Sequence, residues 1–282
     1  MDERTIAGSI PAHEGITPKE RTAPRLPVFA TPGALLVLFI IVPLVGLVWR
    51  AVTAPDFLAS LAKPIVVDAL RLTAMTSATT VVVALVTGTP LAYLLARRAF
   101  PGKWLVEMIV DIPLILPPVV AGVALLIAFG RRGLLGAGLN ALGIEIPFTT
   151  AAVVMAQIFV GIPFYVRSAR LGFISVDPSV EEAAAMDGAS AWRSFRDVTL
   201  PLALPGIASG IVLCWARALS EFGATLMFAG NFIGRTQTMP LAIMSAMESD
   251  LTAALALSLL LIGISGLVLV LSQRLARGWG AS

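Results

Sequence analysis

Six blocks of apolar residues, separated by short polar stretches, dominate this sequence. A helix that crosses the hydrocarbon core of a bilayer needs about 20 mainly apolar residues, because each residue rises only about 1.5 Å. Blocks of this length favour transmembrane helices over core strands or the short helices of a soluble domain. They predict six spans, at about residues 28–49, 72–96, 105–129, 149–166, 204–229 and 251–271.

The third block differs from a simple apolar span. It carries Glu107 and Asp111 near its start, and it contains Pro113, Pro117 and Pro118. Proline removes a backbone donor from a helix, and within lipid the freed carbonyls must find partners in neighbouring protein or in water. We therefore predict a broken or kinked span that packs inside the bundle.

The fifth block contains two opposite charges, Arg217 and Glu221. Insertion scales assign a cost of roughly 2.5–3.5 kcal/mol to a charged side chain at the centre of a span, so both side chains should face protein or water. Their i, i+4 spacing places them on one helical face, where they partly neutralise each other. Two interpretations stay open. One is a buried ion pair that fixes the span; the other is a translocation path lined by this pair and Thr225, with Arg217 attracting an anion.

Composition supports a membrane protein and narrows its chemistry. Of 282 residues, 57% are apolar and 13% are charged, whereas about 25% are charged in typical soluble domains. The net charge of +3 is spread over several polar stretches, which argues against nucleic acid as a partner. One cysteine, Cys214, and one histidine, His13, cannot supply a metal site or His-based catalysis. We expect no cofactor and no metal.

The positions of Lys and Arg predict the orientation of the spans. With the N-terminus inside, most basic residues fall on the cytoplasmic side, as the positive-inside rule requires, although Arg131 and Arg132 oppose it. We therefore expect both termini in the cytoplasm. The expected organisation is a disordered tail over residues 1–27, one transmembrane domain over residues 28–273 and a cytoplasmic tail over residues 274–282.

The polar stretch at about residues 177–201 is the most informative part of the sequence. Asp177-Pro178 is typical of a helix N-cap followed by proline in the first turn, and the two glutamates that follow complement the helix dipole. Gly188 is suited to end this helix, and Ser190 is a candidate cap for a second short helix. From composition alone, this helix-turn-helix is either a link between two spans or a small-sided surface that another protein approaches closely.

The spacing within this stretch resembles a known motif. Glu182-Ala183-Ala184 is followed after three residues by Gly188, and after nine more by Val198-Thr199-Leu200-Pro201. This order is similar to the EAA motif in permease subunits of ATP-binding-cassette (ABC) importers, with valine in place of the usual isoleucine. The resemblance implies a coupling helix that docks on a cytoplasmic ATPase. Its candidate coupling residues are Glu181, Glu182, Ala183, Ala184, Asp187 and Gly188.

The chain lacks the phosphate-binding loop that ATP hydrolysis would require. The pattern G-x-x-x-x-G-K-[ST] needs a lysine followed by Ser or Thr, but Lys19, Lys63 and Lys103 are followed by Glu, Pro and Trp. We therefore expect this chain not to be an enzyme, and we expect ATP hydrolysis on a separate subunit.

Other stretches are similar to the molybdate permease family. They are residues 113–122, residues 130–133, residues 216–225, and the Ala-Gly-Asn and Gly-Arg-Thr-Gln-Thr sequences that follow. Ser220 stands where related permeases commonly carry glycine. The resemblance implies a six-span type I ABC permease bundle in a bacterial or archaeal inner membrane. It also implies a homodimer, two cytoplasmic ATPase subunits and a periplasmic or lipid-anchored oxyanion-binding protein.

The substrate that this resemblance implies is molybdate, with tungstate close to it in shape and charge. Sulfate and thiosulfate permeases share the EAA motif and the Glu-Phe-Gly stretch, so a sulfate permease is the alternative. An ion-coupled secondary transporter that uses Asp111 and Glu221 as proton sites is a rival of another class, but such a carrier needs no ATPase dock. An intramembrane enzyme is disfavoured because no predicted span contains a histidine.

Overall fold

The computed structural model describes residues 26–279, and every regular element in that range is helical. The elements are α1 (Leu26–Val52), α2 (Phe57–Leu61), α3 (Pro64–Arg97), α4 (Lys103–Ile115), α5 (Pro118–Phe129), α6 (Gly136–Ala141), α7 (Thr150–Ile174), α8 (Pro178–Met186), α9 (Ala191–Ser194), the π-helical turn η1 (Phe195–Thr199), α10 (Leu200–Leu219), α11 (Gly223–Ala229), α12 (Met239–Ser249) and α13 (Leu251–Trp279).

The chain divides into two compact units, with the boundary between Gly46 and Leu47. The described part of the first unit is the greater part of α1, an apolar helix that contains Pro32 and Pro43. It begins two residues before the predicted first span. The tail expected over residues 1–27 lies outside the described residues, except for its last two positions, which open α1. The second unit holds all other elements.

The number of spans agrees with the prediction. Five described helices are long and apolar enough to cross a membrane, and a bent pair of helices brings the number to six. The bounds differ, because α3 begins at residue 64 rather than 72 and α7 ends at residue 174 rather than 166. Helix α13 continues to Trp279, so most of the expected C-terminal tail is helical.

The predicted break in the third span is confirmed. Helices α4 and α5 meet at an angle of 119° across Leu116 and Pro117. Both residues are extended there, and Pro118 opens α5 at a position where its missing N–H needs no partner. Helix α5 then approaches α11 closely, because a Cβ added to Gly122 would lie 2.7 Å from the carbonyl oxygen of Ala224. Helix α5 therefore packs within the bundle as predicted, whereas α4 has no buried residue, so the predicted packing does not hold for the first half of the span.

The fifth span is not the continuous helix predicted over residues 204–229. A helix runs from Ala191 through η1 to Leu219, stops for three residues, and restarts as α11 at Gly223. Helix α11 begins where α5 comes close, since a Cβ on Gly223 would lie 2.9 Å from the Pro118 side chain. The π-turn lies just before Pro201, which has no N–H for the carbonyl four residues earlier.

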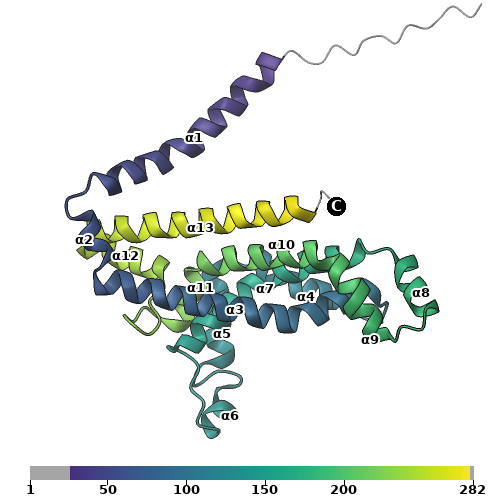
Figure 1. Cartoon of the computed structure of the whole chain (residues 1–282). Coiled ribbons are helices and arrows are strands. Elements are labelled where there is room, and N and C mark those ends of the chain that lie inside the picture. The colour runs from purple at the N-terminus through teal and green to yellow at the C-terminus, as the bar shows by residue number, and fades with distance from the viewer. Residues whose placement is uncertain (1–25, 280–282) are drawn as a thin grey trace, which may run out of the picture. The chain divides into compact units, whose positions relative to one another are not determined.

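Helix α7 is the centre of the second unit. It packs between α3 and α10, with α8 and α9 at one end of the bundle and α2 and α12 at the other (Figure 1). Its fully buried residues include Tyr165, Val166 and Phe173. At the second end, Lys63 Nζ lies 2.5 Å from Asp250 Oδ2, and this hydrogen bond is the main cause of a lowered pKa of the aspartate. The pair joins the start of α3 to the start of α13.

Helices α7 and α10 cross with almost no space between their backbones. A Cβ added to Gly206 would lie 2.4 Å from the Cα of Gly172, and a Cβ on Gly172 would lie 2.8 Å from the Cα of Gly206. The Ser168 hydroxyl donates to the Gly206 carbonyl over 3.0 Å. Small residues that let helix backbones touch are a principal means of packing in membranes.

We expect the substitution Gly206→Ala to destabilise this crossing, because the added methyl group meets backbone atoms that cannot rotate away. Overpacking of this kind costs about 1–3 kcal/mol. The matched control is Gly263→Ala in α13, where no atom lies within 4 Å of the added Cβ. Thermal unfolding of the detergent-solubilised protein measures both, and equal melting temperatures would contradict the close crossing.

Candidate functional site

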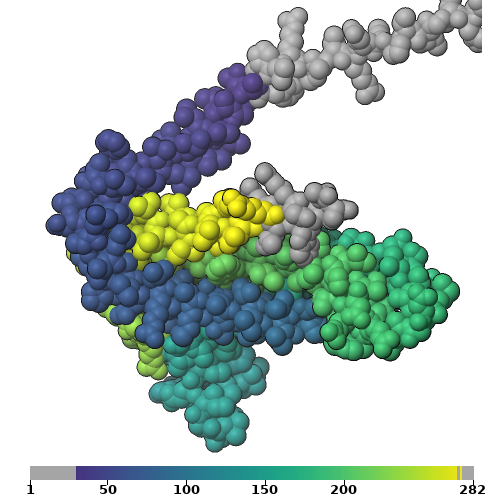
Figure 2. Space-filling view, viewed as in Figure 1, coloured from purple at the N-terminus to yellow at the C-terminus, as the bar shows by residue number. Residues whose placement is uncertain are grey.

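The segment over residues 177–199, which we call the coupling segment, projects at one end of the bundle (Figure 2). Asp177 caps α8 by accepting the Ser179 N–H over 2.9 Å, as predicted. The pKa of Asp177 is held below its ordinary value, mainly by the hydrogen bond from the backbone of Ser179 and secondly by one from its side chain. The cap is therefore charged at neutral pH. Ser190 caps α9 by accepting the Arg193 N–H.

Gly188 ends α8 in the left-handed conformation, with φ +81°. The Gly188 N–H donates to the Ala185 carbonyl and the Ala189 N–H to the Ala184 carbonyl, each over 3.0 Å. This hydrogen-bond pair is the Schellman arrangement, which favours glycine because other residues are strained at positive φ. The predicted role of Gly188 as a helix terminator is confirmed.

The outer face of the coupling segment exposes both apolar and acidic side chains. Met186 is 84% exposed, Trp192 69% and Val180 42%. Four of the predicted coupling residues are exposed beside them, and Ala184 is half-buried. The exposed four are Glu182, Ala183, Asp187 and Gly188. Large apolar side chains gathered on a projecting segment are typical of a surface that another protein covers.

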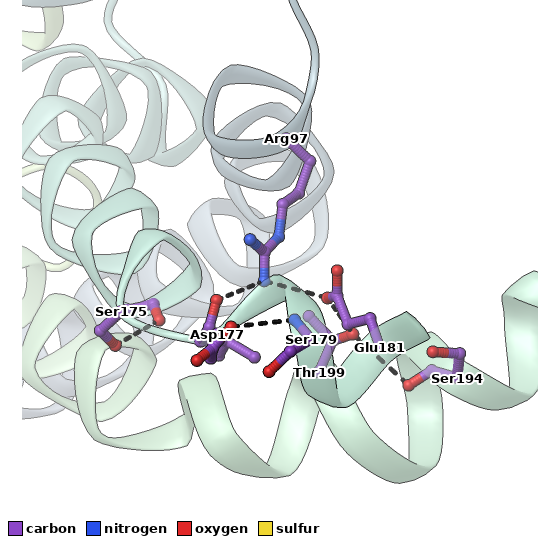
Figure 3. Close-up of polar contacts among 9 residues, drawn as sticks. Arg97, Ser175, Asp177, Ser179, Glu181, Ser194 and Thr199 are labelled. Atoms are coloured by element: carbon purple, nitrogen blue, oxygen red, sulfur yellow. Dashed lines mark hydrogen bonds and ion pairs between the residues drawn. The ribbon is translucent and has the colours of Figure 1, made fainter. Parts of the chain in front are cut away.

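Glu181 faces the opposite way, into the bundle (Figure 3). Its Oε1 atom accepts a hydrogen bond from Arg97 Nη2 over 3.0 Å and another from the Thr199 hydroxyl over 2.6 Å. The same Arg97 nitrogen donates to the Val176 carbonyl, also over 3.0 Å. Sequence reasoning did not identify Arg97, because its partner lies 84 residues away, and it placed Thr199 in the EAA-like motif without predicting its hydrogen bond to Glu181.

An aromatic cluster lies beside this polar contact. Tyr93 of α3 packs edge-on against Phe173 of α7, with ring centroids 5.3 Å apart, and against Phe195 of η1, with centroids 4.9 Å apart. Trp192 stacks on Phe195 from the outer side at 5.7 Å. The stacked pair of Trp192 and Phe195 therefore connects the exposed surface to the core.

Arg217 and Glu221 form the ion pair that their spacing predicted. Arg217 Nη2 lies 2.8 Å from Glu221 Oε2, with the arginine side chain 25% exposed and the carboxylate fully buried. Glu221 lies beyond the end of α10, and its other oxygen accepts the Ala224 N–H over 2.7 Å, which satisfies the start of α11. Thr225 is buried, and its hydroxyl has no hydrogen-bond partner among the described residues.

Helix α3 presents a row of buried hydroxyl groups to its neighbours, which sequence reasoning missed although their spacing marks one helical face. The row consists of Thr73, Thr76, Ser77 and Thr80. Gln157 of α7 bridges two of them: it accepts from Thr80 over 3.0 Å and donates to Thr76 over 3.3 Å. Trp215 of α10 donates to Ser77, and Thr73 accepts the first N–H of α12.

The acidic residues of the third span are both next to arginines of α7. Glu107 Oε1 lies 2.8 Å from Arg170 Nη2, and Asp111 Oδ1 lies 3.7 Å from Arg167 Nε. Within residues 26–279 no group of three or more His, Cys, Asp or Glu side chains could hold a metal ion.

Comparison with known proteins identifies the class. Residues 88–278 match the family described as the inner membrane component of binding-protein-dependent transport systems. The chain belongs to this family, whose members are permease subunits and not enzymes. It is 44% identical over 239 residues to the molybdenum transport system permease protein ModB of Mycobacterium tuberculosis, which covers 85% of this chain and 90% of that protein.

Two further relatives agree. The ModB protein of Escherichia coli K12 is 40% identical over 213 residues, covering 74% of this chain and 93% of that protein. The molybdate/tungstate transport system permease protein WtpB of Thermococcus kodakarensis is 38% identical over 202 residues, covering 71% and 76%.

Solved structures share the fold. A bacterial ABC transporter involved in alginate import superposes with a TM-score of 0.72 at 17% identity, covering 89% of this chain and 94% of that one. The methionine ABC transporter MetNI gives a TM-score of 0.58 at 18% identity, covering 80% of this chain and 99% of that one. The all-helical, multi-span ABC permease fold predicted from the sequence is confirmed.

We expect the substitution Arg217→Met to destabilise the protein more than Glu221→Gln. Removal of the arginine leaves a fully buried carboxylate without its counter-charge, and breaking a buried ion pair from one side costs about 3–5 kcal/mol. Glu221→Gln instead leaves Arg217 without its counter-charge, but this arginine is partly exposed, so water can solvate it. The double variant should recover most of the loss. Thermal unfolding in detergent tests this order, and a reversed order would show that Arg217 is not the required partner.

Proposed function

We propose that this chain is the transmembrane permease subunit of an ATP-driven importer that carries molybdate, and also tungstate, across the inner membrane. Two copies form the pathway between them, two ATPase subunits bind on the cytoplasmic side, and an oxyanion-binding protein delivers the substrate from the periplasm. Both termini lie in the cytoplasm. The assignment of the substrate is supported by the relatives, which are named as molybdenum and molybdate/tungstate permeases and are 38–44% identical to this chain.

The observation that carries the ATP-driven class is the geometry of the coupling segment. Its outer face is exposed and partly apolar, while its inner face is fixed by hydrogen bonds and ring contacts to α3 and α7. A docked ATPase subunit would cover the outer face through Glu182, Ala183, Ala184, Asp187 and Gly188. Displacement of this face would move α10 directly, because one helix runs from the coupling segment into that span.

The pathway is proposed to include the interrupted fifth span. The break of three residues between α10 and α11 contains Glu221, and it is flanked by Arg217 in the last turn of α10 and by Thr225 in the first turn of α11. Non-helical backbone at membrane depth is tolerated where it is buried in protein or lines a cavity. Because the buried Glu221 carboxylate already neutralises Arg217, which is 25% exposed, a passing oxyanion dianion meets a polar surface without net positive charge. Such a surface supports passage without tight capture.

The function is tested by uptake of labelled molybdate into proteoliposomes that hold the permease, its ATPase and its binding protein. We expect uptake that requires ATP and that excess tungstate blocks but sulfate does not. Uptake that sulfate blocks would keep the ABC class and change the substrate. Uptake driven by an ion gradient without ATP would contradict the proposal as a whole.

The proposed contact between the coupling segment and the ATPase subunit is tested at Gly188. The substitution Gly188→Val puts a β-branched residue at a φ of +81° and should distort the end of α8, lowering uptake per ATP hydrolysed by about fivefold or more. The control is Gly102→Val, at a φ of +83° at the start of α4, where likewise no atom lies within 4 Å of an added Cβ. Equal uptake by the two variants would contradict the assignment of the coupling segment.

A further inference from the structure

The two adjacent glutamates at the start of α8 face opposite ways. Glu182 is exposed and forms no ion pair within the described chain, whereas Glu181 is turned toward Arg97 (Figure 3). The Arg97 and Glu181 side chains are 14% and 23% exposed. A charge-assisted hydrogen bond shielded to this degree is stronger than one on an open surface. Glu181 therefore belongs to the inner face of the coupling segment.

One guanidinium nitrogen of Arg97 holds two points of the chain. It donates to the Val176 carbonyl, in the turn between α7 and α8, and to Glu181 in the first turn of α8. Glu181 in turn accepts from Thr199, the last residue of η1, which is buried. Arg97 thus holds the start of the coupling segment directly and its end indirectly, through Glu181.

Helix α3 is not adjacent to the coupling segment in the sequence. Helices α7 and α10 flank the segment in sequence and must follow it, but Arg97 and Glu181 are 84 residues apart. Besides Arg97, α3 contacts this region through the rings of Tyr93 against Phe173 and Phe195 and through apolar residues such as Leu95. Aromatic contacts tolerate sliding more readily than a directed hydrogen bond does.

We propose that Arg97 is a positioning residue that makes α3 move together with the coupling segment. A displacement of α8 would then reach the buried hydroxyl row of α3 and, through Thr73, the start of α12 at the far end of the bundle. This inference rests on the proposed function, since it assumes that an ATPase displaces α8. Arg97 contacts neither the ATPase nor the substrate in this account.

The test uses the complete reconstituted transporter and measures ATP hydrolysis and molybdate uptake on the same sample. We expect Arg97→Gln to keep ATP hydrolysis stimulated by the binding protein but to lower uptake per ATP by about fivefold or more, the lower end of typical coupling. Arg97→Lys retains the charge beside Glu181 and should restore part of the uptake. The matched control is Arg98→Gln, the same change at the exposed neighbouring residue, which should behave as wild type.

A milder variant covers the case in which Arg97→Gln does not assemble. Thr199→Val keeps the shape of the side chain but removes the hydroxyl that donates to Glu181, and it should lower uptake per ATP by a smaller factor. Parallel loss of hydrolysis and uptake in Arg97→Gln, or equal uncoupling in Arg98→Gln, would overturn the proposal. Absence of ATP-driven uptake by the wild-type complex would instead contradict the proposed function.

Discussion

The close crossing of α7 and α10 is the contact on which the positions of the other helices depend. Lipid tails are as apolar as the side chains, so helices in a bilayer associate mainly through packing and internal hydrogen bonds. Gly172 and Gly206 allow the two backbones to touch, and Ser168 adds a hydrogen bond at the same place. Helix α7 also packs against α3, α5 and α11. The location of α10 then sets where Arg217 lies and where the coupling segment joins the bundle.

Three of the arginine–carboxylate ion pairs in this protein join different helices. Arg170 with Glu107 joins α7 to α4, Arg97 with Glu181 joins α3 to α8, and Arg217 with Glu221 joins the two halves of the fifth span. A charge removed from water is costly unless a partner compensates it. The arginines of these pairs are therefore committed to holding the chain together. Contact with a partner protein is left to the side chains of the outer face.

Local features of the sequence predicted most of the helices and the outer face of the site. The length of the apolar blocks gave the spans, the prolines gave the break between α4 and α5, and Asp177 and Gly188 gave the limits of α8. The interruption after Leu219 was not predicted, because residues 220–222 contain no proline and no glycine to mark it. Nothing in the local sequence pointed to a role for Arg97. Its partner became visible when the fold brought residue 181 beside it.

The hydroxyl row of α3 bears on how this helix is inserted into the membrane before its partner helices. Helix α3 enters the membrane long before α7, α10 and α12 have been synthesised, so its hydroxyl groups first meet lipid. Thr76 and Ser77 each donate to a carbonyl three residues earlier in their own helix, over 3.4 Å, and such internal bonds lower the cost of exposure to hydrocarbon. Helix α3 can therefore remain in the lipid before its partner helices are present. Each of the later helices α7, α10 and α12 donates to a hydroxyl of α3, so one helix supplies an acceptor to all three.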